Sequence, residues 1–206
     1  PEPSDAQIDG SSVDAATGGA AFPGLRNGSL EITSTGIPAS TGGVLSSLTV
    51  QAAPWTSCSA PGFGPGCYPS ADLRANFPVG APTAQEKLSP TDGKSLVNAS
   101  PDGTALAQTL SEPLRAGTSY AFMVDLASTN LAMDLSLEVL GGSSPCFSLQ
   151  SLATAGPAIP GVWTSFCVRF TPDRDFASLA LAAISPQAST GTRLFIDHLR
   201  RDPRCN

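Results

Sequence analysis

The chain has 206 residues, of which only 14% are charged, and 17 acidic against 11 basic residues give a net charge of −6. So few basic residues exclude the strongly basic face that nucleic-acid binding requires. No apolar run approaches the ~20 residues that cross a bilayer as a helix, and 20 Gly and 19 Pro spread along the chain favour many short strands joined by turns.

The first 24 residues are acidic and rich in Ser, Gly and Ala, so they cannot bury enough apolar surface to order themselves. We interpret them as a flexible tether. The segment resembles the tether that follows the lipid-modified cysteine of bacterial surface lipoproteins, which implies a lipid anchor upstream and a place at the cell surface. An ordinary frayed terminus is the alternative interpretation.

We expect residues 25–206 to form one domain of short strands. Residues 29–33 follow the turn signal Asn27-Gly28, and residues 44–50 form a second candidate strand. From residue 94 the pattern becomes regular, and apolar residues alternate with polar ones most clearly over residues 131–140. Period two over about ten residues indicates a strand with one buried face. Further strands are predicted at residues 94–99, 105–110, 119–126, 163–170, 178–184 and 193–199. Strands without a helical period predict a sandwich or barrel.

The region of about residues 55–90 is irregular and longer than most connections without a functional role. It holds four aromatic residues, together with two charged residues that could orient a ligand: Trp55, Phe63, Tyr68 and Phe77, with Asp72 and Arg74. Sugar sites combine an aromatic platform with a few polar groups. These aromatic residues therefore form either the rim of a binding site or a small core beneath the loop.

The five cysteines are Cys58, Cys67, Cys146, Cys167 and Cys205. Cys58 and Cys67 flank a Pro/Gly-rich segment, and Cys146 and Cys167 lie at the edges of strand-like runs, so we expect two disulfides with these pairings. Cys205 is then left over, either free or bonded to a partner. The spacings do not fit zinc, and an oxidising compartment is the better interpretation.

Catalytic constellations are weakly supported. The single histidine, His198, is expected on the strand side opposite Asp197, which favours a surface histidine over a catalytic base. Carboxylates for a glycosidase pair are available, but Asp134 and Glu138 alternate with core residues, and we expect both, and Asp125, on a solvated or ligand-facing sheet surface.

Several segments, taken in order, resemble galactose-binding-like jelly rolls, which include many carbohydrate-binding modules. The opening Asn27-Gly28-Ser29-Leu30-Glu31 is similar to that family's N-G-x-F-E motif, and residues 194–199 are similar to its last strand with an aspartate. The other similar segments are residues 90–96, 107–110, 114–120, 137–142 and 163–172. The resemblance implies a jelly-roll β-sandwich of two antiparallel sheets, with Trp163 in its core.

The same resemblance implies a structural Ca²⁺ where the first and last strands meet. Its ligands would be Glu31 and Asp197, with backbone oxygens near Asn27 and Lys94. Two carboxylates and several carbonyls suit Ca²⁺, which takes six to eight oxygens. The alternative is that both acids are solvated or paired with an arginine such as Arg26.

The sequence therefore predicts a non-catalytic extracytoplasmic module, secreted or anchored at a bacterial surface, that binds a glycan or surface polysaccharide. The alternative is a structural or adhesive subunit of a cell-surface assembly, which self-associates or bonds to a partner through Cys205.

Overall fold

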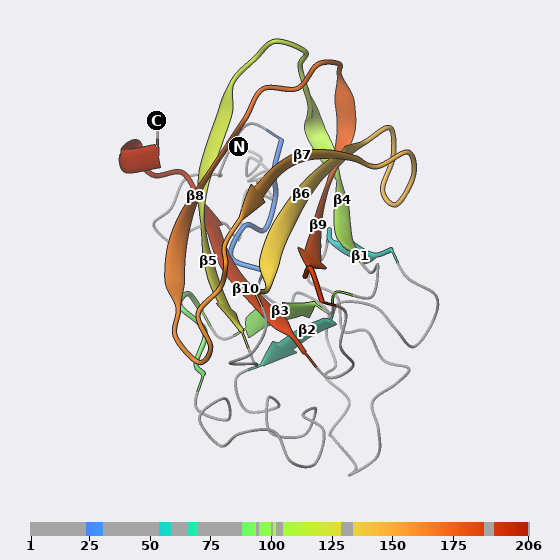
Figure 1. The fold of residues 1–206 in the computed structure, drawn as a ribbon. Helices are drawn as coiled ribbons and strands as arrows, with labels where there is room; N and C mark the ends of the chain where they lie inside the picture. The colour runs from blue at the N-terminus through green and yellow to red at the C-terminus, as the bar shows by residue number, and fades with distance from the viewer. Residues whose placement is uncertain are drawn as a thin grey trace, which may run out of the picture.

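The computed structural model describes residues 24–30, 54–58, 66–69, 88–93, 95–99, 101, 105–128, 134–187 and 192–205. These residues form two facing antiparallel sheets (Figure 1). The β9 sheet has the order β1 (Thr56–Ser57), β4 (Ala105–Leu114), β9 (Phe176–Ile184), β6 (Ser136–Gly142) and β7 (Gln150–Ala155). The β10 sheet has the order β2 (Gly66–Pro69), β3 (Ser95–Ala99), β10 (Leu194–Arg200), β5 (Tyr120–Ser128) and β8 (Thr164–Phe170).

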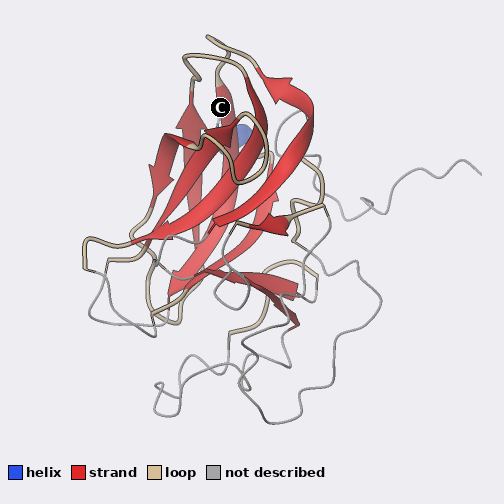
Figure 2. Ribbon diagram, turned by 90° about the vertical axis from the view of Figure 1, so that its right-hand side faces the viewer, coloured by secondary structure: helices blue, strands red, loops and turns tan. Residues whose placement is uncertain are grey.

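The strand pairing is nested. β6 pairs with its neighbour β7, β5 with β8, β4 with β9, and β3 with β10. An antiparallel ribbon folded over in this way is a jelly roll, in which successive strands alternate between two packed sheets. The predicted all-β jelly-roll sandwich is therefore confirmed. Figure 2, turned by 90°, shows that regular structure in the described residues is strand apart from one short helix, η3 (Pro203–Cys205).

The core lies between the inner faces of the sheets, and the alternation of apolar residues explains it. Leu137 and Val139 of β6 and Phe122 and Val124 of β5 are fully buried. Each such side chain stabilises the fold by about 1.5–3 kcal/mol through burial. Gly141 continues the inner row of β6, and the ring of Phe176 occupies the space that a side chain there would need.

The predicted strands from residue 94 onward correspond to β3, β4, β5, β6, β8, β9 and β10, with shifted ends. β7 was not predicted because its residues do not alternate, and β1 and β2 lie in the region expected to be irregular. The predicted strand 29–33 is wrong at its start, where residues 27–30 form a turn closed by Leu30 N donating to Asn27 O at 3.1 Å. The predicted strand 44–50 and the tether up to residue 23 lie outside the described residues.

Residues 24–30 (blue in Figure 1) join the two sheets. Gln108 of β4 exchanges two hydrogen bonds with the backbone of Arg26, while Leu199 N of β10 donates to Gly28 O at 2.8 Å. Leu25 and Leu30 are buried in the core. The opening motif therefore meets the last strand, as the family resemblance implied.

Candidate functional site

A row of polar side chains crosses the outer face of the β10 sheet. Asp125 of β5 lies directly opposite Ser165 of β8 on one side and Asp197 of β10 on the other. On the same strand, β5, Phe122, Val124 and Leu126 point into the core, so Asp125 points outward. Two carboxylates directly opposite each other are unfavourable unless other groups compensate them.

A β-bulge in β10 adds His198 to this row. The register of β10 against β5 shifts between Asp197 and Arg200, and His198 has a left-handed φ of 50°. A bulge re-aims side chains, and its left-handed backbone costs about 1–3 kcal/mol. The imidazole consequently lies on the same face as Asp125, with Nδ1 3.6 Å from Asp125 Oδ2. The prediction that His198 lies on the side opposite Asp197 is wrong because strict alternation stops at the bulge.

Asp125 is buried within the row, with 6% of its side chain exposed. Ser165 Oγ donates to Oδ1 at 2.5 Å, and Arg200 Nη1 lies 2.9 Å from Oδ2. Arg200 also donates to Ser165 Oγ at 3.1 Å. Asp125 therefore lies on the outer sheet surface as expected, but its carboxylate is paired with Ser165 and Arg200 rather than solvated. Asp134 is exposed and Glu138 is partly exposed, as expected.

Asp197 is fully buried and accepts hydrogen bonds on both oxygens. Its Oδ2 accepts from Thr91 N at 2.7 Å, Thr91 Oγ1 at 3.1 Å and Asp92 N at 3.3 Å, and its Oδ1 accepts from His198 N at 2.8 Å. Burial raises the pKa of Asp197 to about 7, against the lowering effect of these donors.

Residues 88–93, here called the strap, cross the outer face beside the row. Leu88 packs in a small apolar cluster with Leu96, Ala127 and Phe195. Trp163 packs against this cluster and donates from Nε1 to the Ser89 carbonyl at 2.7 Å. The prediction of Trp163 in the sandwich core is wrong: the residue precedes β8 and lies on the outside, where it is partly exposed.

The carboxylate and the imidazole that approach each other at this site are both reachable from solvent. The side chains of Asp92 and His198 are 24% and 26% exposed, and Asp92 Oδ2 lies 3.7 Å from His198 Nε2. The Ser165 hydroxyl donates to Asp125 rather than to the imidazole. The arrangement offers a carboxylate, an imidazole and a partly exposed indole, which are groups suited to hydroxyl-bearing ligands.

Of the predicted ligand-binding residues, the structure describes the side chain of Trp55 alone, and this side chain does not belong to the polar row. Trp55 is 1% exposed, lies in the core and donates from Nε1 to Asn27 O at 3.0 Å, so it cannot stack on a ligand. The structure describes Tyr68 only as backbone of β2, and Phe63, Asp72, Arg74 and Phe77 lie outside the described residues. The sequence signal that could have found the row is a charged residue inside an apolar strand, at Asp125 and Asp197.

The described residues do not assemble an oxygen cage for calcium. Both Asp197 oxygens receive N–H or O–H donors, and the Asn27 carbonyl already accepts from Leu30 N and Trp55 Nε1. Glu31 and Lys94 lie outside the described residues, and within the described part no group of three His, Cys, Asp or Glu side chains could hold a metal. The calcium site stays a prediction.

The predicted disulfide pairing is wrong. Cys58 bonds to Cys146, and Cys167 bonds to Cys205. Small outer-face side chains of the β9 sheet (Ala105, Ala107, Ala180 and Ala182) let the connection after β6 lie close to Cys58. Cys205 is thus not available to a covalent partner, and Cys67 is the cysteine left outside these two bonds.

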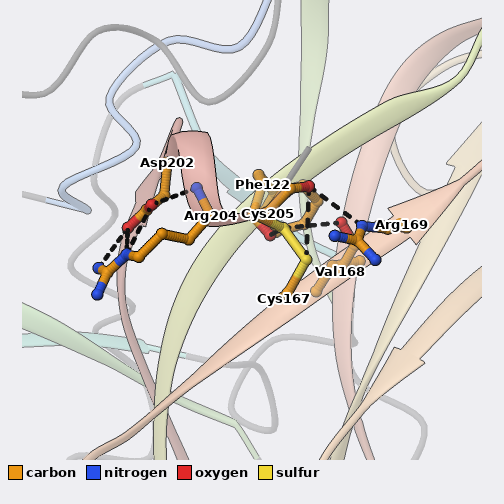
Figure 3. The surroundings of a disulfide bond; sticks show 7 residues. All are labelled: Phe122, Cys167, Val168, Arg169, Asp202, Arg204 and Cys205. Carbon is orange, nitrogen blue, oxygen red and sulfur yellow. Dashed lines mark hydrogen bonds and ion pairs between the residues drawn. A yellow bond between two sulfur atoms is a disulfide. The ribbon is translucent and has the colours of Figure 1, made fainter.

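The second disulfide fixes the C-terminal tail, residues 201–205, on the outer face of the β10 sheet (Figure 3). Arg169 of β8 donates from Nε to the Cys205 carbonyl at 3.2 Å. Within the tail, Arg204 pairs with Asp202 at 2.6 Å and holds the pKa of Asp202 down to about 2. Because Cys167 and Trp163 lie on either side of Ser165 along the chain, the tail and the strap frame the polar row.

The nested strand order defines the class of this protein as a jelly-roll β-sandwich. No protein-family model and no curated protein sequence matches the chain. Within the described part, no helix is long and apolar enough to cross a membrane.

Three similar solved structures contain carbohydrate-binding modules. The first is the CBM22-1 and GH10 modules of Clostridium thermocellum xylanase 10B with xylohexaose, at 14% identity and TM-score 0.39, covering 55% of this chain and 23% of that one. A CBM4 structure has 13% identity and TM-score 0.38, covering 53% and 87%. The CBM22-1 xylan-binding domain of Paenibacillus barcinonensis Xyn10C has 12% identity and TM-score 0.39, covering 53% and 72%. These low values assign neither ligand nor activity to this chain.

Proposed function

We propose that this chain is a non-catalytic, extracytoplasmic binding module that recognises a glycan or surface polysaccharide on the outer face of the β10 sheet. The observation that carries the proposal is the bulge that turns His198 between Asp92 and Asp125. Backbone strain of this kind persists where the surrounding structure enforces it and is common at ligand sites.

The exposed chemistry suits sugars. Sugar hydroxyl groups need both donors and acceptors, which an imidazole and a carboxylate supply, and the apolar face of a sugar ring packs on an aromatic side chain. Asp92 and His198 lie beside each other, and Trp163 lies on the same sheet face against the strap that carries Asp92. Asp125 and Arg200 serve as support, because they already satisfy each other inside the row.

An extracytoplasmic location is supported by the two disulfides, which form and persist in oxidising compartments. For the alternative function as a structural or adhesive assembly subunit, Cys205 does not supply the covalent link, since it is bonded within the chain.

A glycan-array screen followed by calorimetry tests the proposal. His198→Asn removes the imidazole while retaining a residue that tolerates the left-handed backbone. We expect roughly tenfold weaker binding for His198→Asn or Asp92→Asn, the loss of about one ligand hydrogen bond. Asp134→Asn is the matched control, because Asp134 is exposed outside the row.

His198 also provides a direct readout, since it is the single histidine of the chain and gives one set of imidazole NMR signals. These signals should shift when the glycan binds. Absence of binding across the array, or unchanged affinity in both row variants, would contradict the proposal.

A further inference from the structure

We propose that Asp197 is a positioning residue: it holds the strap by hydrogen bonds and so places the Asp92 carboxylate beside His198, rather than serving as a ligand for a cation. The part that concerns glycan affinity rests on the proposed function. The part that concerns the strap and the cation stands independently of it.

The contacts at Asp197 converge on the strap. Three donors from two consecutive residues, Thr91 and Asp92, meet a single oxygen, Oδ2. The other oxygen accepts the backbone N–H of His198 in the bulge. One buried carboxyl group therefore fixes the backbone on both sides of the 3.7 Å approach between Asp92 Oδ2 and His198 Nε2.

The remainder of the strap has anchors of its own. Leu88 is buried against Phe195, and the Ser89 carbonyl accepts from the Trp163 indole. A change at Asp197 should therefore release residues 91–92 while the first half of the strap remains in place. This separation allows positioning to be distinguished from a general loss of structure.

The donor set argues against a cation at the same group. Calcium requires oxygens directed at the ion, whereas Asp197 faces the positive ends of three backbone N–H groups and one hydroxyl. Hydrogen-bond donors pointing at a carboxylate take the place that a cation would occupy.

The first experiment needs no glycan. Thermal melting of the whole chain is compared in CaCl₂ and in EDTA, for the wild type and Asp197→Asn. We expect no calcium-dependent change in the melting temperature. A rise in CaCl₂ that is lost in Asp197→Asn would overturn the proposal in favour of a calcium site.

The second experiment measures amide hydrogen exchange at residues 91 and 92. Thr91→Val removes one donor with little change in shape, and Asp197→Asn replaces one acceptor oxygen by an amide. We expect protection to fall at least roughly tenfold at Thr91 and Asp92 in Asp197→Asn and to be retained in Asp134→Asn. Unchanged protection would overturn the proposal.

The third experiment is a double-mutant cycle on glycan affinity with Asp92→Asn and Asp197→Asn. If Asp197 acts through Asp92, the double variant should bind no more weakly than Asp92→Asn alone, whereas independent effects would add. Additive losses contradict the positioning role. If the wild type binds no glycan, the proposed function fails, and the exchange and melting results still decide the role of Asp197.

Discussion

Removal of the Cys58–Cys146 disulfide should be the most destabilising change of covalent structure in this protein. The bond closes a loop with a sequence separation of 88, against 38 for Cys167–Cys205. Loop-closure entropy gives about 4.5 kcal/mol for the longer loop and about 4 kcal/mol for the shorter one. Measured losses are usually smaller, so we expect about 2–4 kcal/mol for the double variant Cys58→Ser/Cys146→Ser.

The assay is urea unfolding without reductant, compared among the wild type, Cys58→Ser/Cys146→Ser and Cys167→Ser/Cys205→Ser. A peptide map of the non-reduced protein should show the two pairs of the structure, and Cys67→Ser should leave both in place. A Cys58–Cys67 peptide, or a Cys58/Cys146 variant as stable as the wild type, would refute the reasoning.

Three further outcomes are expected. Gly141→Ala would bring a Cβ 2.6 Å from Phe176 Cγ and should lower the free energy of unfolding by about 2 kcal/mol; a loss within measurement error contradicts this packing. Trp55→Phe should lower the free energy of unfolding by about 1–2 kcal/mol, because the hydrogen bond to Asn27 and part of the ring volume are lost. Glycan affinity should be unchanged, and weaker binding would show that Trp55 belongs to the binding site. Burial raises the pKa of Asp197 from 3.8 to about 7, so the folded state binds this proton more tightly than the unfolded state does. The resulting contribution to the free energy of unfolding is complete below pH 4 and is lost as the pH rises to about 7. Wild-type stability relative to Asp197→Asn should fall by on the order of 4 kcal/mol over that interval, and a flat difference would contradict it.

The fold could be predicted where one face of a strand is buried and the other is not. Leu137 and Val139 alternate with Ser136 and Glu138, and β6 lies at this position with the expected inner face. β7 escaped prediction because it is an edge strand whose partly exposed residues have no need to alternate. Alternation of apolar and polar residues reveals a strand only where one face is buried and the other is exposed, so it does not predict a strand that is partly exposed on both faces.

The site was predictable only in part, because its geometry depends on departures from regular structure. Asp197 was singled out, but the bulge after it moves His198 to the other face, and no local signal marks a bulge. The cysteine pairs depend on which loops fold over which sheet face, so proximity in sequence misassigned them.

The nested pairing of strands means that the site forms late in folding. Residues 139 and 153 pair in the inner hairpin, whereas residues 97 and 196 pair in the outermost ribbon. Closing a longer stretch of chain costs more entropy, and pairings distant in sequence form slowly. The polar row and the strap belong to β10 and its neighbours, so they are completed only when the two ends of the domain have come together. A ligand that binds the row would therefore stabilise only the fully folded domain, and this stabilisation grows with the logarithm of ligand concentration once the concentration exceeds the Kd.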